Sequence, residues 1–147
     1  MTAHGGSIDL ARGITAILGA LVLFSAVTQV LEYTLVSASA GGTVQDMASY
    51  IAALNQPSLL AGKAAANLMV GLLAGYMAAK IARTHEMMFA SIAAAAETCS
   101  LVYGFATGEY AALPLWFRVL AASITGPAMM AGAWIRMQAR LAAGEHA

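Results

Sequence analysis

A carboxylate and an amide stand out because each lies deep inside a stretch too apolar for a soluble protein. Glu97 falls near the centre of one such stretch and Asn67 lies at a similar depth in another. A charged group at the bilayer centre costs about 3 kcal/mol on insertion scales, so Glu97 needs a partner, a proton or a ligand. We interpret Glu97 as a proton-carrying or cation-binding group and Asn67 as an orienting amide. The alternative is structural, with Glu97 hydrogen-bonded to Asn67, Thr98 or Ser100.

Two basic residues lie a turn or more inside the ends of their helices. Lys63 and Arg118 are expected roughly 6–8 Å below the outer ends, at 1.5 Å per residue. They predict an electropositive mouth, or they extend toward the headgroups as long basic side chains often do. Glu32 is expected near the same outer level, in a solvated ion pair, with Gln29 slightly deeper. The sequence leaves open whether Lys63 pairs with Glu97 or with Glu32.

Composition predicts the kind of element that holds these side chains. The chain is 61% apolar and 10% charged, whereas soluble proteins are about 25% charged. About 20 apolar residues suffice for a helix to cross a bilayer, and four stretches approach or exceed this length. They are residues 13–36, 58–81, 87–105 and 114–134. We therefore expect an all-α integral membrane protein, a four-helix transmembrane bundle formed by a single domain over residues 1–147.

Two further features concern the first stretch and the segment after it. Polar residues recur at helical spacing on one face of the first stretch, and its opposite face is expected to contact lipid. That apolar face comprises Ile17, Leu21, Phe24, Leu31 and Leu35. Ala38-Ser39-Ala40 resembles a signal-peptide cleavage site, but the long run before it favours a retained helix. Residues 43–54 carry apolar side chains three and four apart, which predicts a short amphipathic surface helix.

Small residues and a proline predict how the helices pack. Gly71 and Gly75 form a GxxxG spacing, which permits close approach of another helix within the monomer or across a homodimer. Gly126 and Pro127 lie well inside the last span. A proline at such a position kinks a helix and can form a hinge.

The basic residues predict orientation. With four spans, one side of the membrane receives most of them, namely Arg12, Lys80, Arg83, Arg136 and Arg140. The positive-inside rule then places both termini in the cytoplasm. The compact chain and the absence of sorting signals favour the cytoplasmic membrane of a bacterium.

Several classes of site are disfavoured. Cys99 is the only cysteine, so a thiolate metal cluster within one chain is excluded. His4, His85 and His146 lie near the termini or in a turn, which argues against a bis-histidine haem. We expect no metal and no cofactor. The seven basic and seven acidic residues cancel, so net charge gives no reason to expect nucleic acid as a partner.

These patterns favour a small membrane protein with an outward-facing polar cavity, which binds or translocates a small polar or amphipathic molecule. The bilayer is the expected partner, together with a homodimer or a larger membrane complex. One alternative is an accessory subunit whose polar contacts only hold helices together. Another is an intramembrane enzyme on a lipidic substrate, with Glu97 as general acid or base and Lys63 or Tyr103 as the second group.

Overall fold

The computed structural model describes residues 4–44 and 46–144 and is built almost entirely of helices. Its elements are α1 (His4–Ala40), α2 (Met47–Leu54), α3 (Pro57–Ala82), α4 (Glu86–Thr107), the 3₁₀ helix η1 (Glu109–Ala112) and α5 (Leu115–Ala142). The described residues contain no strand, so the prediction of an all-α protein is confirmed. The surface helix begins later than predicted because Asp46 caps it by accepting a hydrogen bond from the Ser49 backbone N–H.

Three of the helices are long and apolar enough to cross a membrane. They are α1 over Leu10–Ala40, α3 and α4. The prediction of a membrane protein agrees with this finding. The remaining long helix, α5, is absent from this set; the Ser-Ile-Thr-Gly-Pro sequence at 123–127 lowers the apolar content of its middle.

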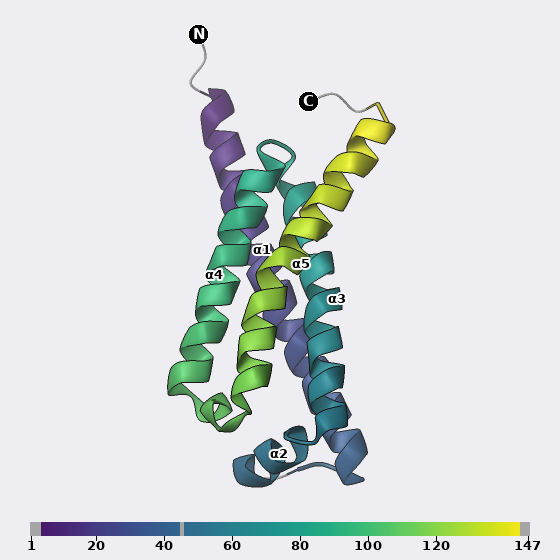
Figure 1. Ribbon diagram of the computed structural model, residues 1–147. Helices are drawn as coiled ribbons and strands as arrows, with labels where there is room; N and C mark the ends of the chain where they lie inside the picture. Colours follow the sequence, from purple (N-terminus) through teal and green to yellow (C-terminus); the bar gives the residue numbers. More distant parts are fainter. Residues whose placement is uncertain (1–3, 45, 145–147) are drawn as a thin grey trace.

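The long helices pack side by side, with α3 in contact with each of the other three (Figure 1). The start of α1, the turn between α3 and α4 and the end of α5 lie at one end of the bundle. At that end Arg140 of α5 donates a hydrogen bond to the Arg83 carbonyl and pairs with Glu86 of α4. The short helices α2 and η1 lie at the opposite end (Figure 1).

Glycines bring α3 and α5 into direct backbone contact. A Cβ built on Gly75 would lie 1.8 Å from the Met129 carbonyl oxygen, and one on Gly132 would lie 1.9 Å from the Leu72 carbonyl oxygen. A Cβ on Gly71 would meet the Ala128 Cβ at 3.0 Å. Only residues without a side chain permit this approach. Gly71 and Gly75 therefore pack within the chain, which removes the sequence-based reason for a homodimer at these residues.

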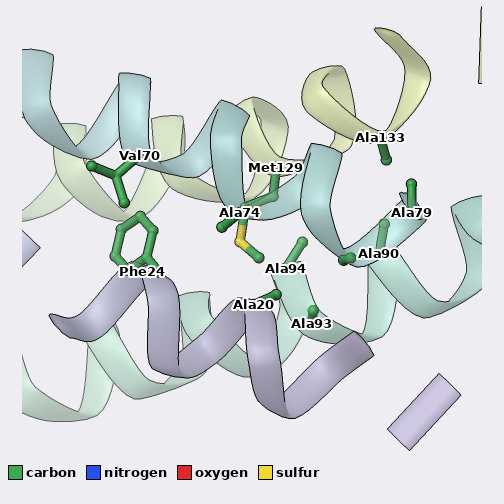
Figure 2. Packing of buried hydrophobic residues seen from close by; sticks show 11 residues of the cluster. Ala20, Phe24, Val70, Ala74, Ala79, Ala90, Ala93, Ala94, Met129 and Ala133 are labelled. Atoms are coloured by element: carbon green, nitrogen blue, oxygen red, sulfur yellow. The ribbon is translucent and has the colours of Figure 1, made fainter. Parts of the chain in front are cut away.

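Small side chains also fill the core between the cavity described below and the α3–α4 turn. Alanines from α1, α3, α4 and α5 meet there around Met129 (Figure 2). Phe24 packs against Val70 in the same cluster and is 2% exposed. The prediction that Phe24 faces lipid is therefore wrong. The exposed apolar face of α1 instead carries Ile14, Leu18 and Val22. The helix is therefore rotated about its axis relative to the orientation predicted from its polar residues.

The sequence prediction of a kink concerns Gly126 and Pro127. The helix α5 continues through Pro127, and Figure 1 shows it changing direction near its middle. Proline has no N–H, so the carbonyl four residues earlier loses its helical donor, and this loosens the turn. A Cβ on Gly126 would lie 3.1 Å from the Thr98 hydroxyl, so α4 passes close to α5 at this point.

Candidate functional site

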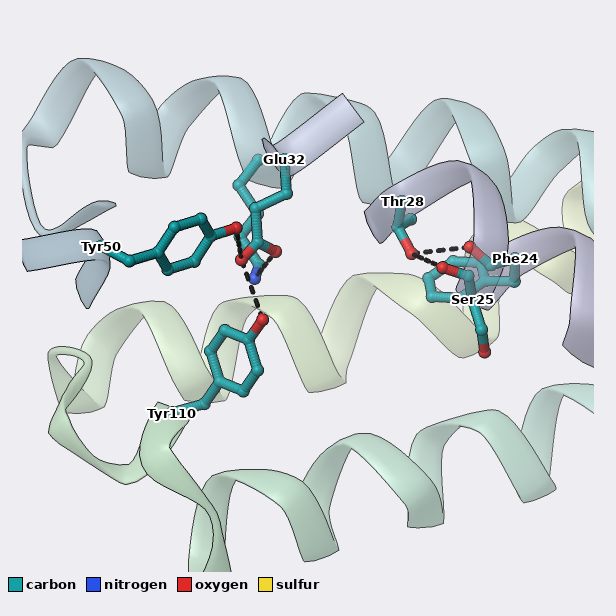
Figure 3. A network of polar contacts seen from close by, with 7 residues as sticks. Phe24, Ser25, Thr28, Glu32, Tyr50 and Tyr110 are labelled. Carbon is teal, nitrogen blue, oxygen red and sulfur yellow. Dashed lines mark hydrogen bonds and ion pairs between the residues drawn. The ribbon is translucent and has the colours of Figure 1, made fainter. Parts of the chain in front are cut away.

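Glu32 of α1 is the acceptor of a buried polar cluster at the α2 end of the bundle. Its Oε2 pairs with the ammonium of Lys63 on α3. Its Oε1 accepts hydrogen bonds from the Tyr50 hydroxyl at 2.8 Å and the Tyr110 hydroxyl at 2.9 Å. Figure 3 shows the two tyrosines reaching the carboxylate from different elements, α2 and η1. The Lys63 nitrogen also lies 4.3 Å from the centroid of the Tyr110 ring, a cation–π contact.

This arrangement answers the question that the sequence left open about Lys63. Both Glu32 and Lys63 are buried, so the predicted solvated ion pair at Glu32 is wrong, and Lys63 neither extends to the headgroups nor pairs with Glu97. Buried charges require such a partner and additional hydrogen bonds. Burial, followed by the neighbouring Glu32 carboxylate, raises the pKa of Tyr50 well above its ordinary range. The Tyr50 hydroxyl therefore keeps its proton and remains a donor.

A cavity of about 190 Å³ lies directly beside this cluster. Its lining comes from α1, α3, α4 and η1: Phe24, Ser25, Thr28, Gln29, Glu32, Lys63, Asn67, Glu97, Ser100, Leu101, Gly104, Phe105 and Tyr110. An apolar cavity of roughly 150 Å³ accommodates benzene, so this one has room for a small molecule or the head of a larger one. The sequence-predicted residues Glu97, Asn67, Lys63, Gln29 and Glu32 all belong to the lining.

Glu97 and Asn67 are buried residues of the cavity lining whose side chains have no hydrogen-bond partner among the described residues, whereas the likewise unpartnered Ser25, Gln29 and Ser100 are exposed. Glu97 is 5% exposed and Asn67 is 2% exposed. Among the hydrogen bonds and ion pairs of the described residues, neither side chain has a partner. The structural alternative for Glu97 named Asn67, Thr98 and Ser100 as its partners. The Thr98 hydroxyl instead donates to the Ala94 carbonyl of its own helix. An unmatched buried carboxylate is costly, and the cavity is where a partner can reach it.

The exposed members of the lining show where the cavity opens. Ser25 and Gln29 of α1 and Ser100 of α4 are exposed, whereas the α3 members are buried. The opening therefore lies on the side between α1 and α4. The sequence predicted a cavity open at the outer end of the bundle; in the structure the cluster around Glu32 lies toward that end.

A second hollow, of about 290 Å³, lies beyond the Glu32 cluster. It is lined by Gln29, Tyr33, Val44, Asp46, Met47, Tyr50 and Tyr110. We call it the vestibule. Gln29 and Tyr110 line both the vestibule and the cavity. The hydrogen bonds of Tyr50 and Tyr110 to Glu32 therefore lie at the boundary between the two hollows.

Arg118 does not join the site. Its Nη1 donates a hydrogen bond to the Phe105 carbonyl near the end of α4, at 3.0 Å. The lining of the cavity contains no residue of α5 among the described residues. The sequence placed Arg118 in an electropositive mouth shared by all four spans. In the structure this side chain instead donates to a carbonyl near the end of a helix, a group that lacks a partner within its own helix.

Tyr50 and Tyr110 were missed by sequence reasoning. Both lie in short elements between the long apolar stretches, and a tyrosine at such a place ordinarily indicates the membrane interface. The one available signal was indirect: a buried Glu32 needs more donors than one lysine supplies.

The same geometry weighs against the enzyme alternative. Of the two groups proposed to assist Glu97, Lys63 is committed to Glu32 and Tyr103 is 71% exposed on α4. A second group for proton transfer has to lie within hydrogen-bond reach of the reacting atoms, and among the described contacts neither residue bonds to Glu97.

The chain matches no protein-family model, no curated protein and no solved structure.

No group of three His, Cys, Asp or Glu side chains within the described part of the chain is placed to hold a metal ion; His146 lies outside the described residues. The chemistry present is one unmatched carboxylate, two side-chain amides, hydroxyls and an internally neutralised ion pair, beside aromatic and aliphatic side chains. This combination suits reversible binding.

Proposed function

We propose that this protein binds a small polar or amphipathic molecule in the cavity between α1, α3 and α4. The observation that carries this proposal is the pair of buried, unmatched groups, Glu97 and Asn67, in the wall of a cavity large enough for a ligand. Binding sites typically combine an apolar wall with a few polar groups that fix orientation. Phe24, Leu101 and Phe105 supply the apolar wall.

Translocation is the wider form of the proposal. It is supported by the vestibule, which lies on the other side of the Tyr50 and Tyr110 contacts with Glu32. A molecule that passes between the two hollows has to displace or bypass these hydrogen bonds.

In this proposal α5 is the fourth transmembrane helix. The support is that α5 lies beside α3 from Phe117, which packs in one cluster with Leu60, to Arg140, which binds the Arg83 carbonyl. Two exposed tryptophans lie along it, Trp116 at its start and Trp134 about two turns before its end. Their separation along a helix is roughly 27 Å, close to the thickness of the hydrocarbon core, and tryptophans favour both interfaces.

The proposed location is the cytoplasmic membrane of a bacterium, with both termini in the cytoplasm. This orientation is supported by five basic residues toward the end that holds the start of α1, the α3–α4 turn and the end of α5: Arg12, Lys80, Arg83, Arg136 and Arg140. A retained first span is supported by α1's contributions to the protein, since it supplies Phe24 to the core and Glu32 to the ion pair.

The test uses infrared difference spectroscopy on the protein in lipid nanodiscs. Substitution Glu97→Gln identifies the carboxyl band of Glu97, and Glu86→Gln identifies that of a second buried glutamate on α4, which is paired with Arg140. Three probes of equal chain length are then added separately at neutral pH: hexylamine, hexanol and hexanoate. We expect at least one probe to shift the Glu97 band and leave the Glu86 band unchanged.

A probe that shifts both bands alike acts on the bilayer and not on the cavity. If none of the three probes shifts the Glu97 band selectively, the binding proposal is wrong, and the cavity is a structural void.

A further inference from the structure

The charges around the two hollows are unequal. Within the described lining of the cavity the charged residues are Glu32, Lys63 and Glu97, and within that of the vestibule the charged residue is Asp46. Lys63 is the single base, and Glu32 neutralises it. The remaining formal charges are the carboxylates of Glu97 and Asp46.

This imbalance bears on the charge of the ligand. Among the described lining residues an anion finds no available base in either hollow, because the Lys63 ammonium is already bound by Glu32 and lies against the Tyr110 ring. With a neutral ligand Glu97 has either to take up a proton or to stay charged without a counter-charge in a buried site. A cation both matches the charge and donates the hydrogen bond that the carboxylate lacks.

The vestibule has the same preference on independent grounds. Tyr33 and Tyr50 present aromatic rings in its lining, and aromatic faces attract organic cations. Asp46 belongs to the same lining and is exposed. The Ser49 backbone N–H holds the pKa of Asp46 below its usual range, so this carboxylate is charged at neutral pH.

We propose that the ligand of the cavity is a small organic cation, an amine or ammonium with an apolar tail, held by the Glu97 carboxylate and the Asn67 amide. The tail would lie against Phe24, Leu101 and Phe105 or leave through the opening between α1 and α4. The vestibule would concentrate the same class of molecule at the outer end. This inference rests on the proposed function and adds the chemical class of the ligand.

The test is equilibrium binding of radiolabelled hexylamine to the protein in nanodiscs, with hexanol and hexanoate as competitors. Hexylamine is expected to bind at least about tenfold more tightly than hexanol, the ratio expected for one charge-assisted hydrogen bond. Hexanoate is expected not to compete. Glu97→Gln should weaken hexylamine binding about 10- to 100-fold, while Glu86→Gln, the matched loss of a buried carboxylate outside the cavity, should leave it unchanged.

The outcomes separate this inference from the proposed function. If hexanol shifts the Glu97 band and competes as well as hexylamine, the protein binds a ligand but the cation inference is wrong. If no probe shifts the band, both fail. Should Glu97→Gln not assemble, Glu97→Asp keeps the charge and must keep the preference for amine over alcohol; loss of that preference overturns the inference.

Discussion

The Lys63 ammonium of α3 forms its ion pair with the Glu32 carboxylate of α1, and the pair is buried at the boundary between two hollows. Removal of one partner of a buried pair leaves an uncompensated charge. We therefore expect Lys63→Met to destabilise the protein by about 3–5 kcal/mol. Equilibrium unfolding in mixed micelles measures this loss.

The matched test is a double-mutant cycle. Adding Glu32→Gln to Lys63→Met removes both charges and should recover part of the lost stability, because no charge then remains unpaired. The same cycle with Glu97→Gln in place of Glu32→Gln should show no such recovery. Recovery with Glu97→Gln alone would contradict the pairing described here.

The glycine contacts between α3 and α5 give a second prediction. Gly75→Ala places a methyl group 1.8 Å from the Met129 carbonyl oxygen, so the two helices have to separate. Overpacking costs typically about 1–3 kcal/mol, and backbone contact allows less relief than a flexible side chain. We expect a lower thermal midpoint and weaker protection of both helices from proteolysis.

Gly62→Ala is the control on the same helix. Its methyl group would meet Leu35 Cδ1 at 3.5 Å, an ordinary contact. Because alanine favours a helix over glycine by about 0.5–1 kcal/mol, this variant should be neutral or slightly stabilised. Equal destabilisation by both substitutions would show that α3 and α5 do not approach as closely as described.

The sequence was sufficient to predict where the long helices lie along the chain. It was insufficient to predict how each helix is rotated about its own axis. Long apolar stretches with a proline and a GxxxG spacing predicted the long helices and the close packing of Gly71 and Gly75. The burial of Phe24 was not predictable in the same way, because an apolar side chain suits both lipid and a protein core in a membrane. Pairing of Lys63 likewise depends on which face of α3 meets α1.

The candidate site shows the same limit. Glu97 and Asn67 were identified because polar residues are rare inside membrane helices. Tyr50 and Tyr110 were missed because α2 and η1 fold back over the bundle end, and no local pattern in a short connecting segment encodes where it docks. Arg118 was assigned to the site from its depth alone, whereas its partner is the Phe105 carbonyl.

The Tyr50 hydroxyl gives a prediction about access to the cavity. Tyr50→Phe removes one of two hydroxyl donors to Glu32 Oε1 but keeps the ring. If this hydrogen bond resists passage between the hollows, the variant should take up and release hexylamine faster. The equilibrium affinity should change little, because Glu97 is untouched. Stopped-flow measurement of hexylamine binding in nanodiscs tests this prediction. The control is Tyr33→Phe, because Tyr33 also lines the vestibule but forms no hydrogen bond with Glu32 among the described contacts.

The capping residue of α2 gives a prediction about pH. Asp46 accepts a hydrogen bond from the Ser49 N–H, which lowers the pKa of Asp46 from its ordinary 3.8. The cap therefore stabilises α2 fully above that value, and its contribution is lost as the pH falls through the lower, folded-state pKa. Hydrogen exchange of α2 amides, corrected for intrinsic rates, should show protection that declines only in this acidic range.

Two variants distinguish loss of the Asp46 cap from an effect of low pH on the whole protein. Asp46→Asn retains a cap oxygen without a titrating group, so its protection should be independent of pH. Asp46→Ala removes the cap, so α2 should be poorly protected at every pH. Equal protection of the wild type and Asp46→Ala at neutral pH would contradict the role of this cap.

The crossing of the membrane by α5 gives a final prediction, which decides between three and four spans. In a Cys99→Ser background, single cysteines are placed at exposed positions outside the long helices, namely Thr43, His85, Ala111 and Ala143. An impermeant maleimide applied to intact bacterial spheroplasts should label Thr43→Cys and Ala111→Cys. His85→Cys and Ala143→Cys should react only after permeabilisation, because the positive-inside rule places the α3–α4 turn and the end of α5 in the cytoplasm.

Thr43 and His85 serve as the outer and inner references, so the contrast between Ala111 and Ala143 reports on α5 alone. If these two positions react on the same side, α5 does not cross, and Trp116 and Trp134 do not mark two interfaces.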